Sequence, residues 1–194
     1  MIYAFLAQGF EEVEAIAAID VIRRAEIDIC TVGVGSKVIT GAHGISVICD
    51  LEDSNVFTSE EFDGVLLPGG MPGTLNLENC AKVSEFIDYA AENDKLICAI
   101  CAAPSILGHK GLLKNKTAVC FPGFEDELTG AKVSDDFVVT DGNIITAKGM
   151  GSAVEFGLAT VKKIKGRKTS DFSDIISGEI HDEVIHRDNM VLMI

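Results

Sequence analysis

The sequence predicts a doubly wound α/β fold, in which helices cover both faces of a mostly parallel sheet. Short runs rich in branched aliphatic residues alternate with longer segments whose apolar residues recur at helical spacing. The aliphatic runs are almost continuous in hydrophobicity, which is typical of strands buried on both faces of a parallel sheet. These two observations together favour a sheet whose strands are connected by helices.

Five aliphatic runs are predicted as the central strands, at residues 2–7, 27–34, 64–67, 96–100 and 144–147. The segments between them that have the length or the apolar spacing of helices are 11–25, 83–92, 102–108 and 152–165. Two further stretches, 38–49 and 137–145, are predicted as extra strands or hairpins, the second turning at Asp141-Gly142-Asn143.

Length and composition predict one domain over residues 1–194, because 194 residues with 47% hydrophobic content suffice for one core. The net charge of −14 argues against a nucleic-acid surface, and no apolar run is long enough to span a bilayer. Acidic residues at positions 11, 12 and 14 argue against a secretory leader. Four of the six cysteines lie in or beside strand-like segments, which favours reduced thiols. We therefore expect a cytoplasmic protein with no direct nucleic-acid or membrane partner.

In doubly wound sheets, ligands bind beyond the carboxyl ends of the strands. We expect five segments to converge on this edge, which we call the rim: 8–14, 68–73, 101–104, 120–124 and 148–151.

Cys101 lies where the strand 96–100 breaks into a turn of small residues that opens a helix. A residue at such an elbow is held in a strained turn, close to the unpaired N–H groups of the new helix. Those donors are expected to favour the thiolate over the thiol. Cys101 is therefore the candidate nucleophile; the alternative is one more buried core thiol.

Two neighbouring features complete the candidate site. The glycines of segment 68–73 allow backbone N–H groups to form an oxyanion hole, or simply make a tight connection. Glu14 lies in the first helical turn after the first strand, where its carboxyl can point toward Cys101. A protonated Glu14 can donate a hydrogen bond to the Cys101 thiolate. The alternative is a solvated first-turn acid, which is what we expect of Glu11 and Glu12.

Other motifs are weaker. Cys98 and Cys101 form a Cys-x-x-Cys, but Cys98 lies inside the strand, which argues against a dithiol or zinc site. Two Gly-x-Gly fragments, 33–35 and 149–151, lack the third small residue of a dinucleotide fingerprint. The rim segments contain none of the four histidines, at positions 43, 109, 181 and 186. We expect no metal, no cofactor and no Cys-His dyad.

Five motifs together resemble the ThiJ/PfpI superfamily, and within it the branch of the parkinsonism-associated deglycase and its bacterial relatives. They are AQGFEEVE (7–14), DVIRRA (20–25), LPGG (67–70), AICAAP (99–104) and EFGLA (155–159). The resemblance covers roughly residues 1 to 166 and implies a flavodoxin-like three-layer sandwich that is usually a homodimer. Residues 166–194 are then expected to be a divergent C-terminal extension.

The resemblance also implies roles for individual residues. Cys101 matches the family's reactive cysteine and Glu14 its hydrogen-bonded glutamate, while Gly70 and Ala102 match its backbone donors. Three further positions are expected at the pocket or the dimer interface: Gly69, Phe121 and Cys49.

Two positions depart from the family pattern. Phe121 stands where the parkinsonism-associated member has a histidine, which removes the obvious general base. Ala102 stands where the PfpI-type proteases have a histidine after the nucleophile, which argues against peptide hydrolysis.

The resemblance implies glyoxalase activity on 2-oxoaldehydes without added cofactor, or repair of early glycation adducts. We therefore expect a cysteine-dependent stress-response protein that acts on a small aldehyde or a glycated substrate. The main alternative is a non-catalytic redox sensor or redox-regulated chaperone oxidised at Cys101. A thiamine-biosynthesis role and a cysteine amidase or protease are weaker alternatives.

Overall fold

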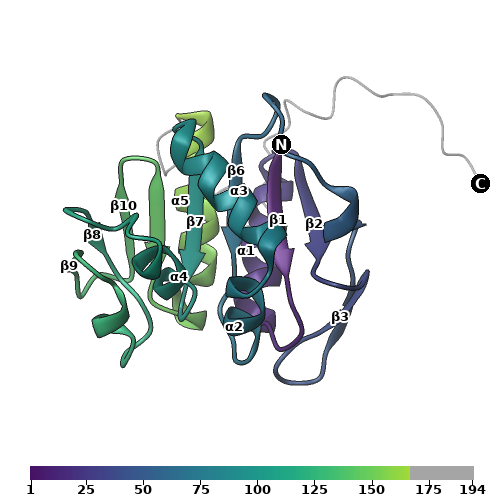
Figure 1. Ribbon diagram of the computed structural model, residues 1–194, viewed down its shortest axis with the longest axis horizontal. Helices are drawn as coiled ribbons and strands as arrows, with labels where there is room; N and C mark the ends of the chain where they lie inside the picture. The colour runs from purple at the N-terminus through teal and green to yellow at the C-terminus, as the bar shows by residue number, and fades with distance from the viewer. Residues whose placement is uncertain (167–194) are drawn as a thin grey trace, which may run out of the picture.

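The computed structural model describes residues 1–166, and its centre is a seven-stranded sheet in the order β10-β11-β7-β6-β1-β2-β5 (Figure 1). All neighbouring strands pair in parallel except β10 and β11. The strands are β1 (Ile2–Leu6), β2 (Ile29–Gly33), β5 (Leu51–Glu52), β6 (Gly64–Leu67), β7 (Leu96–Ile100), β10 (Val138–Asp141) and β11 (Ile144–Ala147). The expected C-terminal extension beyond residue 166, with His181 and His186, lies outside the described residues.

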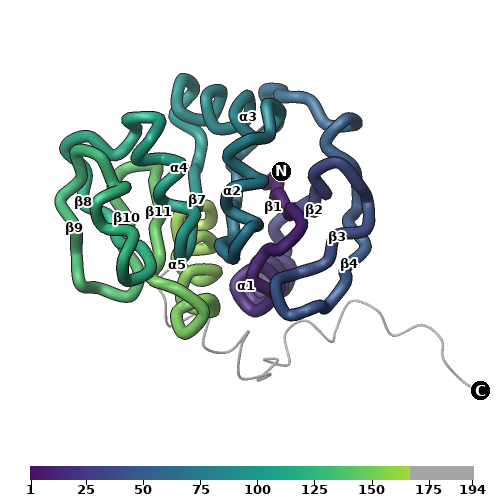
Figure 2. Tube along the Cα trace, turned by 60° about the horizontal axis from the view of Figure 1, so that its bottom comes forward, coloured from purple at the N-terminus to yellow at the C-terminus, as the bar shows by residue number. Residues whose placement is uncertain are grey.

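Helices cover both faces of this sheet, as Figure 2 shows. One layer consists of α1 (Glu12–Arg24) and α5 (Ala153–Lys165), which pack against each other. The opposite layer consists of α2 (Gly73–Glu78), α3 (Ala81–Glu92) and α4 (Pro104–His109). The predicted α/β class with a mostly parallel sheet is therefore confirmed.

Successive side chains of a buried strand point to opposite faces of the sheet, and both faces are covered by helices. This explains why the strand sequences are continuously apolar. In β7, Leu96, Cys98 and Ile100 join the core beneath α1 and α5, whereas Ile97 and Ala99 join the core beneath the other helices. The central strand β7 thus contributes to two cores, and no position along it is left for a polar side chain.

The ends of α1 and α5 follow ordinary capping chemistry. Oε2 of Glu11 accepts a hydrogen bond from the backbone N–H of Glu14 at 2.7 Å and so caps α1. Gly166, in a left-handed conformation with φ of 64°, ends α5. The Glu11 cap orders the first turn of α1, which carries Glu14.

The smaller elements were predicted only in part. The stretch 38–49 forms the expected hairpin, β3 (Val38–Thr40) with β4 (Ser46–Ile48), and β10 and β11 form the second. Elements that the sequence did not reveal are α2, β5, the pair β8 (Thr117–Ala118) and β9 (Lys132–Val133), and the 3₁₀ turns η1 (Asp53–Asn55), η2 (Glu125–Glu127) and η3 (Met150–Ser152). Each has two to six residues, too few to display a hydrophobic period.

Across residues 1–166, no helix combines the length and the apolar character that a bilayer crossing requires.

Candidate active site

The five rim segments meet around Cys101. The N–H of Cys101 donates to the carbonyl of Ala147 at 2.8 Å, and the N–H of Phe121 donates to the carbonyl of Cys101 at 2.8 Å. On the other side, the N–H of Glu11 donates to the carbonyl of Gly69 at 2.9 Å. Segments that lie far apart in the sequence are thus tied together at the carboxyl edge of the sheet.

Cys101 occupies the elbow between β7 and α4 with φ of +66°. A left-handed conformation costs a residue with a Cβ roughly 1–2 kcal/mol, so the neighbouring contacts must hold it in place. The side chain is partly exposed, unlike that of Cys98. The thiol is therefore presented at the rim.

Glu14 points inward from the first turn of α1 and is only 1% exposed. Its Oε2 accepts a hydrogen bond from the N–H of Gly69 at 3.0 Å, and its carboxyl interacts directly with the Cys101 thiol. Burial raises the pKa of the Glu14 carboxyl to about 7. The group is therefore poised to gain or lose a proton near neutral pH.

Neighbouring groups shift the pKa of the Cys101 thiol in opposite directions. Burial and the adjacent Glu14 carboxylate raise its pKa, whereas the backbone N–H groups of Ala102 and Gly70 lower it. The elbow donors thus favour the thiolate as expected, but while Glu14 is ionised they are outweighed by burial and by its charge, so the net direction of the pKa is upward. Protonation of Glu14 removes that charge and turns its carboxyl into a donor to sulfur. Protonation of Glu14 therefore shifts the balance toward the thiolate, although burial continues to oppose it.

The glycines beside the pair leave room for nothing larger. A Cβ on Gly69 would lie 2.6 Å from the Cys101 Cβ and 2.7 Å from Oε2 of Glu14. Gly70 adopts φ of +94°, and a Cβ there would lie 2.4 Å from the backbone nitrogen of Glu11. Only glycine at both positions allows the loop, the carboxyl and the thiol to pack so closely.

Glu12, expected to be solvated, is instead buried and 5% exposed. It accepts hydrogen bonds from His43 N at 2.7 Å and from Ile45 N at 3.4 Å, and its Oε2 lies 2.9 Å from His43 Nδ1. Burial acts to raise the Glu12 pKa, but these bonds outweigh it and lower the pKa. Glu12 thus ties the β3–β4 turn to α1, a contact between residues 31 positions apart that no local pattern could reveal.

Ligand atoms of Glu11, Glu12 and His43 lie within 4.8 Å of one another, so these residues are of a type and spacing that could hold a cation. Oε1 of Glu12 already accepts from the backbone N–H groups of His43 and Ile45, and Oε2 contacts the His43 ring, which accounts for the cluster without an ion.

Cys98 and the described histidines do not join the site. Cys98 is fully buried, with its Sγ 3.4 Å from Oγ1 of Thr160 on α5. His43 pairs with Glu12, and His109 pairs with Glu78 and Glu127 at the surface. Within residues 1–166, Glu14 is therefore the titratable side chain that interacts with the Cys101 thiol.

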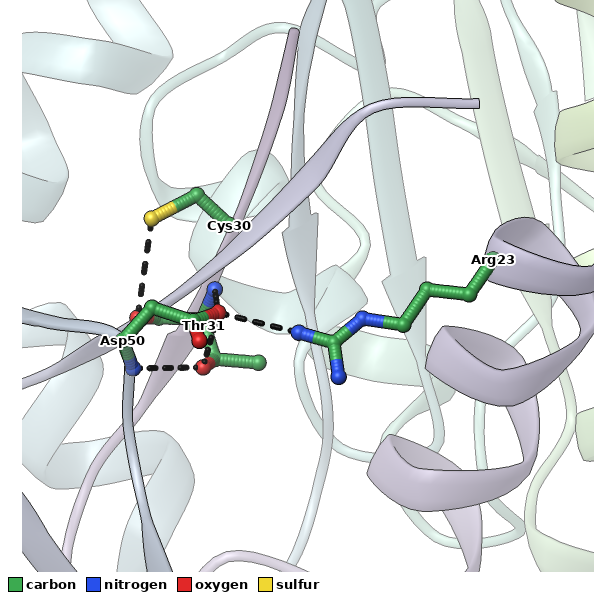
Figure 3. Close-up of polar contacts among 4 residues, drawn as sticks. All are labelled: Arg23, Cys30, Thr31 and Asp50. Carbon is green, nitrogen blue, oxygen red and sulfur yellow. Dashed lines mark hydrogen bonds and ion pairs between the residues drawn. The ribbon is translucent and has the colours of Figure 1, made fainter. Parts of the chain in front are cut away.

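Cys49 lies elsewhere, in the wall of a hollow of 220 Å³ between α1 and β4. It is 1% exposed, and burial raises its pKa to about 11. The adjacent Asp50 carboxylate accepts hydrogen bonds from the N–H and hydroxyl of Thr31 and pairs with Arg23 at 2.9 Å (Figure 3). Cys49 is thus a buried thiol beneath the α1 and hairpin surface.

The model of the DJ-1/PfpI family matches residues 1–163, nearly all of the described chain. The chain belongs to the DJ-1/PfpI family. The resemblance to ThiJ/PfpI proteins and the flavodoxin-like three-layer sandwich that it implied are both confirmed.

Several relatives align over most of the chain. The Drosophila melanogaster protein dj-1beta is 34% identical over 166 residues, covering 84% of this chain and 88% of that protein. The glutathione-independent glyoxalase DJR-1.2 of Caenorhabditis elegans is 32% identical over 158 residues, covering 80% and 83%. Glyoxalase function is therefore present among members of the family. The chain spans only 42% of DJ-1 homolog A of Arabidopsis thaliana, at 34% identity.

A solved structure of oxidized Toxoplasma gondii DJ-1 superposes with a TM-score of 0.84 at 28% identity, covering 92% of this chain and 96% of that one.

Proposed function

We propose that this protein is a cofactor-independent glyoxalase or deglycase that uses Cys101 and Glu14. The observation that carries the proposal is the buried Glu14 carboxyl, whose pKa lies near neutral, in direct contact with the partly exposed thiol of Cys101. A carboxyl with that pKa can act as an acid and then as a base at physiological pH. The named glyoxalase among its relatives supports the same activity.

The chemistry follows from this pair. The Cys101 sulfur adds to the aldehyde carbon of a 2-oxoaldehyde, and the carbonyl oxygen takes up a proton to give a hemithioacetal. Glu14 removes the proton from the former aldehyde carbon and returns one to the adjacent carbon, which leaves a thioester of the 2-hydroxy acid. Water then hydrolyses the thioester, releasing the acid and restoring the thiol. The N–H groups of Gly70 and Ala102 stabilise the oxygen on which negative charge develops.

Phe121 does not supply a base, so Glu14 carries both proton transfers in this proposal. The same sulfur chemistry extends to early glycation adducts, in which the aldehyde carbon is already attached to an amine or thiol. In that case Cys101 displaces the amine or thiol from the aldehyde carbon, the released group takes up a proton, and the resulting hemithioacetal then follows the same steps.

The test is methylglyoxal consumption with chiral detection of lactate, without glutathione, in the wild type and in Cys101→Ser. We expect the variant to lose turnover, because a serine hydroxyl is far less ionised and a weaker nucleophile. The matched control is Cys80→Ser, which changes the other partly exposed cysteine and is expected to keep the wild-type rate. Lactate formation by Cys101→Ser at the wild-type rate would contradict the proposal.

A second candidate function is a redox sensor, favoured because the same thiol is partly exposed and has donors at its sulfur. Absence of turnover in wild type and variant alike, with peroxide converting Cys101 selectively to the sulfinate, would favour the sensor over the enzyme.

The small aldehyde or glycated adduct is the substrate partner in this proposal, and a second copy of the chain is the protein partner. The amino-terminal half of α1 and the β3–β4 hairpin expose a set of apolar side chains: Val13 (46%), Ile16 (44%), Ile45 (59%) and Ile48 (77%). Ile16 and Ile48 line the same hollow above Cys49, so they form part of one surface. Surfaces of this kind commonly serve as interfaces between proteins.

We expect sedimentation equilibrium at micromolar concentration to show a dimer that Ile48→Glu dissociates, because the new charge would be buried without a partner. Phe57, at 69% exposure, provides the control variant Phe57→Glu, since it lies outside this surface, beneath the Lys82 side chain of α3. A wild-type monomer, or dissociation by the control alone, would exclude this interface.

The cytoplasmic location is likewise proposed, supported by six cysteines that are all free thiols.

A further inference from the structure

An aromatic hollow of 280 Å³ opens beside the candidate active site. Two phenylalanine rings form its walls, and both are unusually exposed, Phe121 at 47% and Phe137 at 64%. Met150, at 56% exposure, and Pro122 add to the apolar lining. Large apolar side chains that remain this accessible around one concavity are typical of a ligand site.

The residues that line the hollow adjoin the reacting groups. The backbone N–H of Phe121 donates to the carbonyl of Cys101 at 2.8 Å, and the backbone N–H of Met150 lies near enough to the Glu14 carboxyl to lower its pKa. Only Gly149 separates the ring from the carboxyl, since a Cβ there would lie 3.2 Å from Cδ2 of Phe121 and 3.8 Å from Oε1 of Glu14. A molecule attached to the Cys101 sulfur therefore has the aromatic wall within reach of its substituent.

The charged side chains that line the hollow limit the class of ligand that it can bind. Among the residues that line it, Lys148 is the one charged side chain, and its Nζ lies 5.9 Å from the centre of the Phe137 ring. Nζ donates to the backbone carbonyl of Asp135 at 3.4 Å, and in the described part of the chain it has no carboxylate partner. Lys148 thus disfavours a cation, and the otherwise apolar, aromatic lining favours a neutral aromatic group.

We propose that this hollow is the substituent site of the enzyme, and that its preferred substrates are 2-oxoaldehydes bearing an aryl group rather than the methyl group of methylglyoxal. The inference rests on the proposed function only in taking Cys101 as the reacting atom. Phe121 then contributes to substrate binding. Where a relative has a histidine that can act as a base, Phe121 offers a ring face against which an aromatic substituent packs, at ring-to-ring distances typical of aromatic pairs.

The test measures the reaction of Cys101 with two α-bromoketones, 2-bromoacetophenone and bromoacetone. In each case the sulfur forms a bond to the CH₂ carbon, bromide leaves and the thiol proton passes to solvent. The two reagents differ only in phenyl against methyl, so the ratio of their rate constants, divided by the same ratio for free cysteine, reports the substituent site. We expect a preference of about tenfold for the phenyl reagent in the wild type.

Two variants locate the preference. Phe121→Ala and, independently, the more exposed Phe137→Ala are each expected to lower the ratio several-fold, because each removes one aromatic wall. Phe57→Ala is the matched control: it truncates an exposed phenylalanine that also lies over a lysine, but outside the hollow, and it should keep the wild-type ratio. A wild-type ratio equal to that of free cysteine, or a ratio unchanged in both wall variants, overturns the inference. Because alkylation needs no turnover, absence of lactate formation would overturn the proposed reaction and leave this result standing.

Discussion

Replacing Glu14 by glutamine is expected to abolish turnover and, at the same time, to stabilise the fold at pH 8. The glutamine amide can still accept the hydrogen bond from the N–H of Gly69, so the local geometry is retained. It cannot take up or release a proton, and loss of a general acid and base typically reduces rates by about 10² to 10⁴. Cys101 should still be alkylated to completion, since its position at the elbow does not depend on residue 14.

The stability gain follows from the raised pKa of Glu14. Its pKa is about 7 in the folded protein against an ordinary value of 4.5, so between these pH values the folded state holds a proton that the unfolded state has released. The unfolding free energy of the wild type therefore falls as pH rises from 4.5 to 7 and stays low above that range. One pKa unit corresponds to 1.36 kcal/mol, which makes the full loss about 3 kcal/mol.

Urea unfolding at pH 5, 6, 7 and 8 measures this effect. The Glu14→Gln and wild-type stabilities should differ little at pH 5, and the variant should be the more stable by pH 8. The control is Glu155→Gln, which neutralises an exposed acid in the first turn of α5 and should leave the pH dependence unchanged. If the unfolding free energies of the wild type and Glu14→Gln changed with pH in the same way, the fold would not be holding the Glu14 carboxyl protonated.

Gly69→Ala is expected to reduce turnover by about 10²-fold by forcing Cys101 and Glu14 apart. The new methyl group would overlap both the Cys101 Cβ and the Glu14 carboxyl, which lie 2.6 and 2.7 Å from its position. Displacements of about 1 Å between reacting groups cost on the order of 10² in rate. The overpacking should also destabilise the fold by roughly 1–3 kcal/mol.

A double-mutant cycle separates loss of the pair from general damage. If Gly69→Ala acts by disrupting the contact between Glu14 and Cys101, it should add little to the loss already caused by Glu14→Gln. The steady-state lactate assay supplies the rates, and urea unfolding identifies any fraction that is unfolded. If the two substitutions reduced turnover additively, Gly69→Ala would act other than by disrupting the contact between Glu14 and Cys101.

The strand pattern was predictable because burial on both faces leaves a local signature. The runs 64–67, 96–100 and 144–147 coincide with β6, β7 and β11. Long helices such as α1 and α5 were likewise evident from their apolar spacing. The short elements α2, β8 and β9 were not, since they are formed by contacts with distant segments rather than by their own periodicity.

The sequence by itself determined the fold class, the family and the elbow that presents Cys101, because each depends on residues that are adjacent in the chain. It also named Glu14 as the partner of Cys101, but it assigned Glu12 to solvent and left open whether the Glu14 carboxyl is protonated. Only the tertiary structure decided these points. Burial and hydrogen bonding across tens of residues set the pKa of each carboxyl, so that Glu12 is held ionised by the β3–β4 turn while Glu14 is shielded beside the thiol.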